Sequence, residues 1–180
     1  MKVTRKQEME TNNIQIGDQI QLGKYTATCQ KVTDGKALFL LDQYLDKPYA
    51  MNATNTNKGG YGASDLHAEF KNIILDPNFD SIRSFLVPFE NGDFMRLPTV
   101  GEMFGHDDYY KMDDAQQWEL MKDRRNRIAL REGDEYEWGW LQNEVKVSAA
   151  RFALVCWGGA SGCYGAAHSL GVRPALQLVL

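Results

Sequence analysis

The chain has 180 residues, of which 43% are hydrophobic and 24% are charged. These proportions favour one folded globular domain and exclude a disordered or membrane-embedded chain. Its 20 basic and 24 acidic residues give a net charge of −4, which lacks the basic excess typical of nucleic-acid binding. Three cysteines are too few for the disulfide framework of a small secreted domain.

Charge is distributed unevenly along the chain. Residues 145–180 contain no acidic residue and three basic ones, whereas the first 144 residues contain 17 basic and 24 acidic residues. The acidic body is therefore followed by a segment of small and apolar residues, a composition typical of buried strands joined by tight loops. No stretch of 18 apolar residues is present, so we expect no membrane insertion.

The first 13 residues are polar and lack the apolar core of a signal peptide. We expect them to be a solvated lead-in to a single domain over residues 14–180. Apolar residues at 14, 16, 20 and 22 alternate with polar ones, and this pattern and the next segment, 26–32, predict short antiparallel strands. Thr33-Asp34-Gly35 predicts a turn into a buried strand at Ala37–Leu41.

The middle of the chain carries helix signals. A helix with one apolar face is predicted over Ser64–Leu75, because Ser64 can cap it and Asp76-Pro77 stops it. Thr99–Gly105 contains a capping box and a terminating glycine, which predict a short helix. A third helix is predicted to begin at Asp113 or Asp114 and to carry two apolar residues, Trp118 and Met121.

The last third returns to strand patterns, at residues 127–131, 135–141, 152–157 and 172–180, with a turn at Glu132-Gly133-Asp134. Strands at both ends with two or three helices between them predict an α+β domain with small twisted antiparallel sheets. The residues expected in the core of the sheet are Trp138, Trp140, Phe152, Leu154, Val172 and Leu176.

Several motifs resemble the C-type-lectin-like domains, in the branch of formylglycine-generating enzymes and of the variable proteins of diversity-generating retroelements. The motifs similar to the carboxy-terminal half are Gly139-Trp140-Leu141-Gln142, Arg151-Phe152-Ala153-Leu154-Val155 and Gly171-Val172-Arg173-Pro174-Ala175-Leu176. Those similar to an uncharacterised bacterial and phage domain of the branch are Ile16-Gly17-Asp18, Leu22-Gly23, Ser64-Asp65-Leu66 and Arg96-Leu97-Pro98-Thr99 with Glu102. The resemblance implies a C-type-lectin-like fold over residues 14–180, without implying carbohydrate or calcium binding.

The motif at the end of the chain, Gly171–Leu176, favours a structural role. We expect Gly171 to adopt a positive φ where the chain re-enters the sheet. Arg173 is the only charged residue among the last 29, so its burial would require a carboxylate or several carbonyl groups as partners.

Residues 148–170 have an unusual composition. They include no Lys, Glu, Gln or Met, although these four types supply 38 of the 180 residues and about five would be expected here. In the variable proteins that the chain resembles, mutation of template adenines in Asn codons yields Ala, Ser, Gly, Cys, Tyr, His, Leu, Phe, Arg or Val, but none of those four. The resemblance therefore implies a diversified ligand-binding segment, with Trp157 as a fixed scaffold residue.

Binding through this segment would combine aromatic area with adaptable polar contacts, as antibody loops do. The candidate ligand-binding residues are Arg151, Phe152, Cys156, Trp157, Ser161, Cys163, Tyr164, His168 and Ser169. The absence of long polar side chains also fits a second interpretation, in which the segment is a buried hairpin rich in Gly and Ala.

Cys156 and Cys163 introduce a catalytic alternative. Formylglycine-generating enzymes carry a reactive cysteine pair near this position, and thiolates suit soft metals such as Cu(I). Six residues separate the two cysteines here, against four in the enzymes, so we expect neither catalysis nor a functional metal or cofactor. His106-Asp107-Asp108, with Asp113 and Asp114, lacks the alternating ligands of a calcium loop, and we expect helix capping and a solvated loop instead.

The lead hypothesis is a non-enzymatic receptor-binding or adhesion protein of a virus, phage or mobile element. Its ligand would be a host surface protein or glycan, and a homo-oligomer stays open as a further partner. The alternatives are a cysteine-dependent oxidase and a structural virion domain. The sequence leaves the localisation open, with a virion or cell surface expected under the lead hypothesis.

Overall fold

The computed structural model describes residues 13–131, 133 and 135–180. Residues 1–12 of the expected lead-in, and Glu132 and Asp134 of the expected turn, lie outside the described residues. Small antiparallel sheets, short α-helices and 3₁₀ helices make up the structure, which confirms the α+β class. No helix in the described ranges has the length and apolar character needed to cross a membrane.

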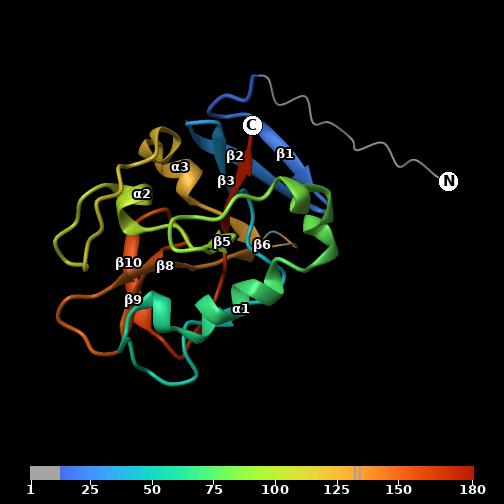
Figure 1. Cartoon of the computed structure of the whole chain (residues 1–180). Coiled ribbons are helices and arrows are strands. Elements are labelled where there is room, and N and C mark those ends of the chain that lie inside the picture. Colours follow the sequence, from blue (N-terminus) through green and yellow to red (C-terminus); the bar gives the residue numbers. More distant parts are fainter. Residues whose placement is uncertain (1–12, 132, 134) are drawn as a thin grey trace.

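The principal sheet has five antiparallel strands in the order β1-β2-β3-β12-β5. Its strands are β1 Gln19–Leu22, β2 Tyr25–Thr33, β3 Lys36–Leu41, β12 Ala175–Val179 and β5 Met95–Arg96. Figure 1 shows the red carboxy-terminal strand running beside the blue amino-terminal ones. The last strand therefore lies inside the sheet, so the fold is completed only when the end of the chain pairs with β3.

A second sheet has three antiparallel strands in the order β10-β9-β8. These are β8 Gly139–Glu144, β9 Arg151–Val155 and β10 Ser161–Gly165. Two short pairs complete the strands: β4 Tyr49–Ala50 with β11 Ser169–Leu170, and β6 Leu130–Arg131 with β7 Glu135–Tyr136. The predicted strand regions are thus largely confirmed, although the segment predicted from residue 127 is strand only at its end.

The first two predicted helices form through the predicted caps. Helix α1 spans Asp65–Ile73, and the Ser64 hydroxyl accepts a hydrogen bond from the His67 N–H. Helix α2 spans Val100–Phe104 behind a complete capping box, and Gly105 ends it with a φ of 79°. The 3₁₀ helices η1 Tyr61–Ala63 and η2 Pro77–Phe85 flank α1.

The third predicted helix is wrong in its start. The Asp113 carboxylate accepts a hydrogen bond from the Ala115 N–H and closes a local turn instead of capping a helix. Trp118 is the residue before the 3₁₀ helix η3 Glu119–Lys122, and its N–H donates to the Glu102 carbonyl, 2.9 Å away. Helix α3 Arg124–Arg127 follows, capped by Asp123, and includes Arg127, the first residue of the region predicted as strand.

Two hydrophobic clusters form the core. The first joins the apolar face of α1 to the five-stranded sheet and to Trp140, Phe152 and Leu154, and the second joins α2 to Ala153 and Val155. Both faces of β9 are therefore buried. The predicted core residues are confirmed as buried except Trp138, which is half-buried at the edge of the first cluster.

The first residue of β8, Gly139, pairs with Gly171 in the segment that leads to β12. The Trp140 N–H donates to the Gly171 carbonyl at 3.0 Å, and the Gly171 N–H donates to the Trp138 carbonyl at 2.8 Å. The buried Tyr44 ring covers this contact: an added Cβ would lie 2.4 Å from the ring at Gly139 and 2.7 Å at Gly171. The positive φ expected at Gly171 is wrong, since the glycine is required by the ring and not by its backbone angle.

Arg173 has the buried structural position that its sequence context suggested. Its Nε donates to the Leu41 carbonyl at 2.5 Å, and its Nη1 donates to the carbonyls of Asn126 at 3.0 Å and Arg127 at 3.4 Å. Burial lowers the pKa of the guanidinium, and the carbonyl dipoles offset part of that desolvation cost. The side chain thereby ties the entry to β12 to the end of β3 and to α3.

Gly171→Ala should lower the free energy of unfolding by about 1–3 kcal/mol, the usual cost of overpacking, because the new methyl group would collide with Tyr44. Gly62→Ala is the matched control, since an added Cβ there meets nothing within 4 Å. Urea unfolding monitored by tryptophan fluorescence measures both. Equal stability of the two variants would contradict the role given to the Tyr44 ring.

Arg173→Ala should lower the free energy of unfolding by about 3 kcal/mol, because buried carbonyl groups lose a charged donor. Arg151→Ala removes the same charge from an exposed position and should change stability by less than about 0.5 kcal/mol. Thermal and urea melts compare the two. An Arg173→Ala variant as stable as Arg151→Ala would show that the three carbonyl contacts contribute nothing.

Candidate functional site

Most candidate ligand-binding residues lie on the hairpin of β9 and β10 and on the chain that follows it. β10 is the end strand of its sheet. Its pairing places Tyr164 opposite Phe152 and Cys163 opposite Ala153. Because neighbouring residues of a strand point to opposite faces, the hairpin divides the candidate residues between two surfaces.

On one of these surfaces, Tyr164 packs against two other aromatic rings. Its ring centroid lies 5.3 Å from that of Trp138 and 4.2 Å from that of His168, both in edge-to-face arrangements. Tyr164 is 38% exposed and His168 is also exposed. The structure thus brings two predicted site residues into direct contact and supports them with a half-buried tryptophan.

Beside these rings lies a hollow of about 360 Å³, which we call the Tyr164 hollow. Its lining residues are Asn55, Ala150, Arg151, Tyr164, Gly165 and His168. Arg151 contributes the one permanent charge of this lining, and no carboxylate is part of it. The hollow therefore combines an aromatic wall with hydrogen-bond donors and a positive group, which suits a ligand with acceptor atoms.

An asparagine-rich loop fixes the backbone around the hollow. The Asn52 N–H donates to the Ala166 carbonyl at 3.0 Å, and the Asn55 side-chain oxygen accepts from the Ala167 N–H at 3.0 Å. The Asn57 amide donates to the carbonyls of Ser148 at 2.7 Å and Arg151 at 3.1 Å. These bonds hold both ends of the hairpin in place.

Sequence reasoning missed the contribution of this loop to the site. Asn55, in the loop between β4 and η1, was not among the candidate residues. The signal was its run of asparagines, since such side chains satisfy backbone groups in irregular segments.

Four other candidate residues lie outside the hollow. Trp157 is 62% exposed at the tip of the hairpin, where the Arg124 Nε donates to the Gly158 carbonyl at 2.5 Å. Ser169 is exposed in β11. Ser161 and Cys163 share the opposite face of β10, where Cys163 lies near Tyr109.

Phe152 is a correction to the predicted site. Its side chain is 0% exposed and belongs to the first hydrophobic cluster. It shares a face of the hairpin with Tyr164, but it lies on β9, which has β8 on one side and β10 on the other. Phe152 is therefore a core residue and not a ligand contact.

The two cysteines of the hairpin point to opposite faces of the sheet. An added Cβ at Gly162 would lie 2.8 Å from the Cys156 Sγ, so Cys156 shares the face of Gly162, while the next residue, Cys163, faces the other side. The Cys163 Sγ lies 3.8 Å from the Tyr109 hydroxyl. Burial, and then the nearby Cys163, raise the pKa of the Cys156 thiol, which disfavours the reactive thiolate.

The acidic segment before η3 forms exposed contacts, including one between Asp108 and Lys146 at 3.4 Å. The Asp107 carboxylate accepts from the Tyr109 N–H at 3.0 Å, and His106 lies 3.0 Å from Asp108 in an exposed pair. Within the described ranges, no three His, Cys, Asp or Glu side chains gather in a way that could hold a metal ion.

No family model matches the chain, and no curated protein or solved structure matches it. The resemblance to C-type-lectin-like domains therefore rests on the sequence motifs, and function is argued from the side chains of the site.

Alkylation of Cys156 by iodoacetamide should have a pH midpoint above that of an unperturbed thiol, because folding raises its pKa. The same peptide in guanidinium-unfolded protein is the internal control, with a lower midpoint. In Cys163→Ser the midpoint of the folded protein should fall, since one cause of the shift is removed. Mass spectrometry of the peptide measures all three. A fully reactive thiolate at pH 7 would overturn this assignment and favour the cysteine-dependent oxidase.

Proposed function

We propose that this protein is a non-enzymatic ligand-binding module whose binding surface is centred on the Tyr164 hollow. The observation that carries the proposal is the convergence of exposed Tyr164, His168 and Arg151 on one hollow with a hydrogen-bonded backbone. Aromatic side chains offer contact area at a low cost in conformational entropy, and a fixed backbone lowers the entropy lost on binding.

The exposure pattern of residues 148–170 supports a display surface built on a packed frame. The four residues of β9 after Arg151 are buried, whereas the exposed residues lie just before and at the start of β9, in the turn before β10, in β10 and in the chain after it. The exposed residues of the segment are Ala149, Arg151, Trp157, Ala160, Ser161, Tyr164, His168 and Ser169. All except Trp157 belong to the residue types that adenine mutation of Asn codons yields.

On this basis we propose that the chain is a variable protein of a diversity-generating retroelement with a C-type-lectin-like scaffold. Its ligand would be a surface protein or glycan of a host cell. Because Arg151 brings positive charge and the lining of the hollow lacks a carboxylate, a neutral or acidic ligand with hydrogen-bond acceptors fits this surface best.

Ser161→Ala, Tyr164→Ala and His168→Ala should each change the free energy of unfolding by less than about 1 kcal/mol, because they remove only surface contacts. Trp140→Ala should cost about 3–5 kcal/mol, since its ring is buried and its Nε1 donates to the Tyr49 carbonyl at 2.9 Å. Urea melts of the four variants decide between a display surface and a core hairpin. Should Tyr164→Ala and His168→Ala prove as costly as Trp140→Ala, the segment is core and the proposal fails.

The retroelement origin has its own test in the source genome. A reverse transcriptase gene should lie near the coding sequence, beside a near-copy of the part that encodes residues 148–170. The two copies should differ at template adenines, in codons for the exposed residues. A genome without such a near-copy would contradict the retroelement origin. The proposal of a binding module would then be tested by the urea melts alone.

A further inference from the structure

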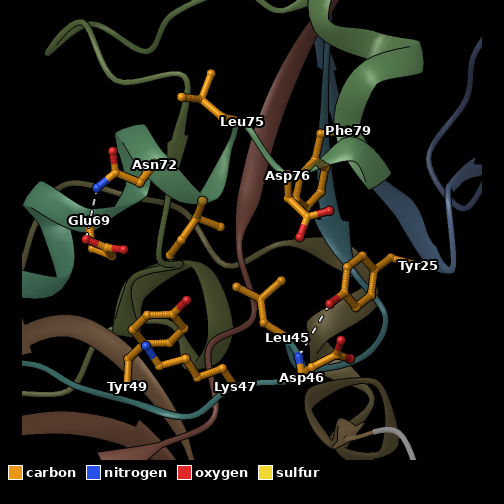
Figure 2. Close-up of a pocket in the computed structure, with 11 residues that line it drawn as sticks. Tyr25, Leu45, Asp46, Lys47, Tyr49, Glu69, Asn72, Leu75, Asp76 and Phe79 are labelled. Atoms are coloured by element: carbon orange, nitrogen blue, oxygen red, sulfur yellow. Dashed lines mark hydrogen bonds between the residues drawn. The ribbon is translucent and has the colours of Figure 1, made fainter.

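A second hollow, of about 460 Å³, lies between α1, η2 and the chain after β3. No lining residue is shared with the Tyr164 hollow. Figure 2 shows Glu69 and Asn72 of α1 on one side, with Tyr49 below them, and Tyr25 and Asp46 on the other side. We call it the Tyr49 hollow.

Aromatic and aliphatic side chains form its walls. Tyr25 and Phe79 are buried and stacked on each other, with ring centroids 6.0 Å apart and planes 14° apart. Ile73 of α1 and Leu45 are also buried lining residues. These fixed walls would cover the apolar part of a ligand at little cost in protein entropy.

Carboxylates from three separate segments border the same space. Asp46 follows β3, Glu69 lies on α1 and Asp76 precedes η2. Burial, followed by the negative charges of Glu69 and Asp76, raises the pKa of the Tyr49 hydroxyl, so both carboxylates act on that hydroxyl. Asp46 is paired with Lys24, so it is the potential of Glu69 and Asp76 that favours a positive group over the hollow.

The chain already places a cation on one wall. The Lys47 ammonium lies 4.9 Å from the centroid of the Tyr49 ring, within the range of a cation–π contact. Lys47 is exposed and its stem is flexible, so an external cation can displace it. An ammonium group on a short alkyl chain is the ligand whose chemistry this contact reproduces.

We propose that the Tyr49 hollow binds an alkylammonium group, with the charge near Glu69 and Asp76 and the alkyl chain along the aromatic and aliphatic walls. This chemistry occurs in free diamines and in the side chain of lysine in a protein partner. The inference stands independently of any ligand at the Tyr164 hollow.

The test is a titration followed by ¹H–¹⁵N correlation spectra of the full chain. Cadaverine probes the free diamine, Nα-acetyl-lysine amide probes the protein side chain, and 1,5-pentanediol is the neutral isostere of cadaverine. Saturable shifts at the amides of Tyr49 and Glu69 are expected with at least one amine and not with the diol. The amine that binds more tightly identifies the source. Failure of both amines, or equal shifts with the diol, would overturn the proposal.

Matched variants separate the hollow from general charge attraction. Glu69→Gln should weaken amine binding about fivefold, and Lys47→Ala should strengthen it by a similar factor, because one removes a partner and the other a competitor. Glu90→Gln and Lys31→Ala make the same charge changes at exposed positions outside the lining and should leave the affinity unchanged. Equal effects of the two acidic variants, or of the two lysine variants, would show that amine affinity depends only on the net charge of the protein. That result would overturn the proposed site.

Discussion

The close approach of two backbones at Gly139 and Gly171, beneath the ring of Tyr44, is the contact on which the rest of the structure depends. It connects β8 of the three-stranded sheet to the segment that leads into β12, the strand between β3 and β5 of the five-stranded sheet. Arg173 secures the same segment two residues later. Because β8 is fixed there, β9 is held with both faces buried, and β10 becomes the free end of the sheet. Stability and exposed surface are thereby carried by different strands.

Sequence reasoning predicted the features that local chemistry determines. The caps of α1 and α2 involve residues three apart, so Ser64, Thr99 and Glu102 could be identified without tertiary information. The helix expected from Asp113 failed because an aspartate closes a turn as readily as it caps a helix, and a contact with Glu102 positions Trp118. The requirement for glycine at position 171 also comes from a residue distant in the sequence, because the ring of Tyr44 leaves no room for a Cβ.

The candidate site could be predicted only in part for the same reason. Tyr164 and His168 are four residues apart, and the composition of their segment drew attention to both. Asn55 reaches the site across 112 residues, and no pattern in the sequence announces that pairing. Phe152 was predicted both as a core residue and as a ligand contact, and only the first prediction is confirmed, because β9 lies in the middle of its sheet with the Phe152 side chain fully buried. The Tyr49 hollow, whose walls come from several distant segments, left no motif at all.

The central claim is that the frame is stable whatever the exposed surface carries, and a combinatorial library tests it most directly. Ser161, Tyr164, Ala167 and His168 would be randomised together, displayed on yeast and sorted for resistance to protease, beside a library of equal size at Phe152, Leu154, Trp140 and Val172. The account predicts that most clones of the first library stay folded with no residue preferred at the four positions, and that the second library retains large apolar residues. A first library whose folded clones all recover Tyr164 and His168 would contradict it.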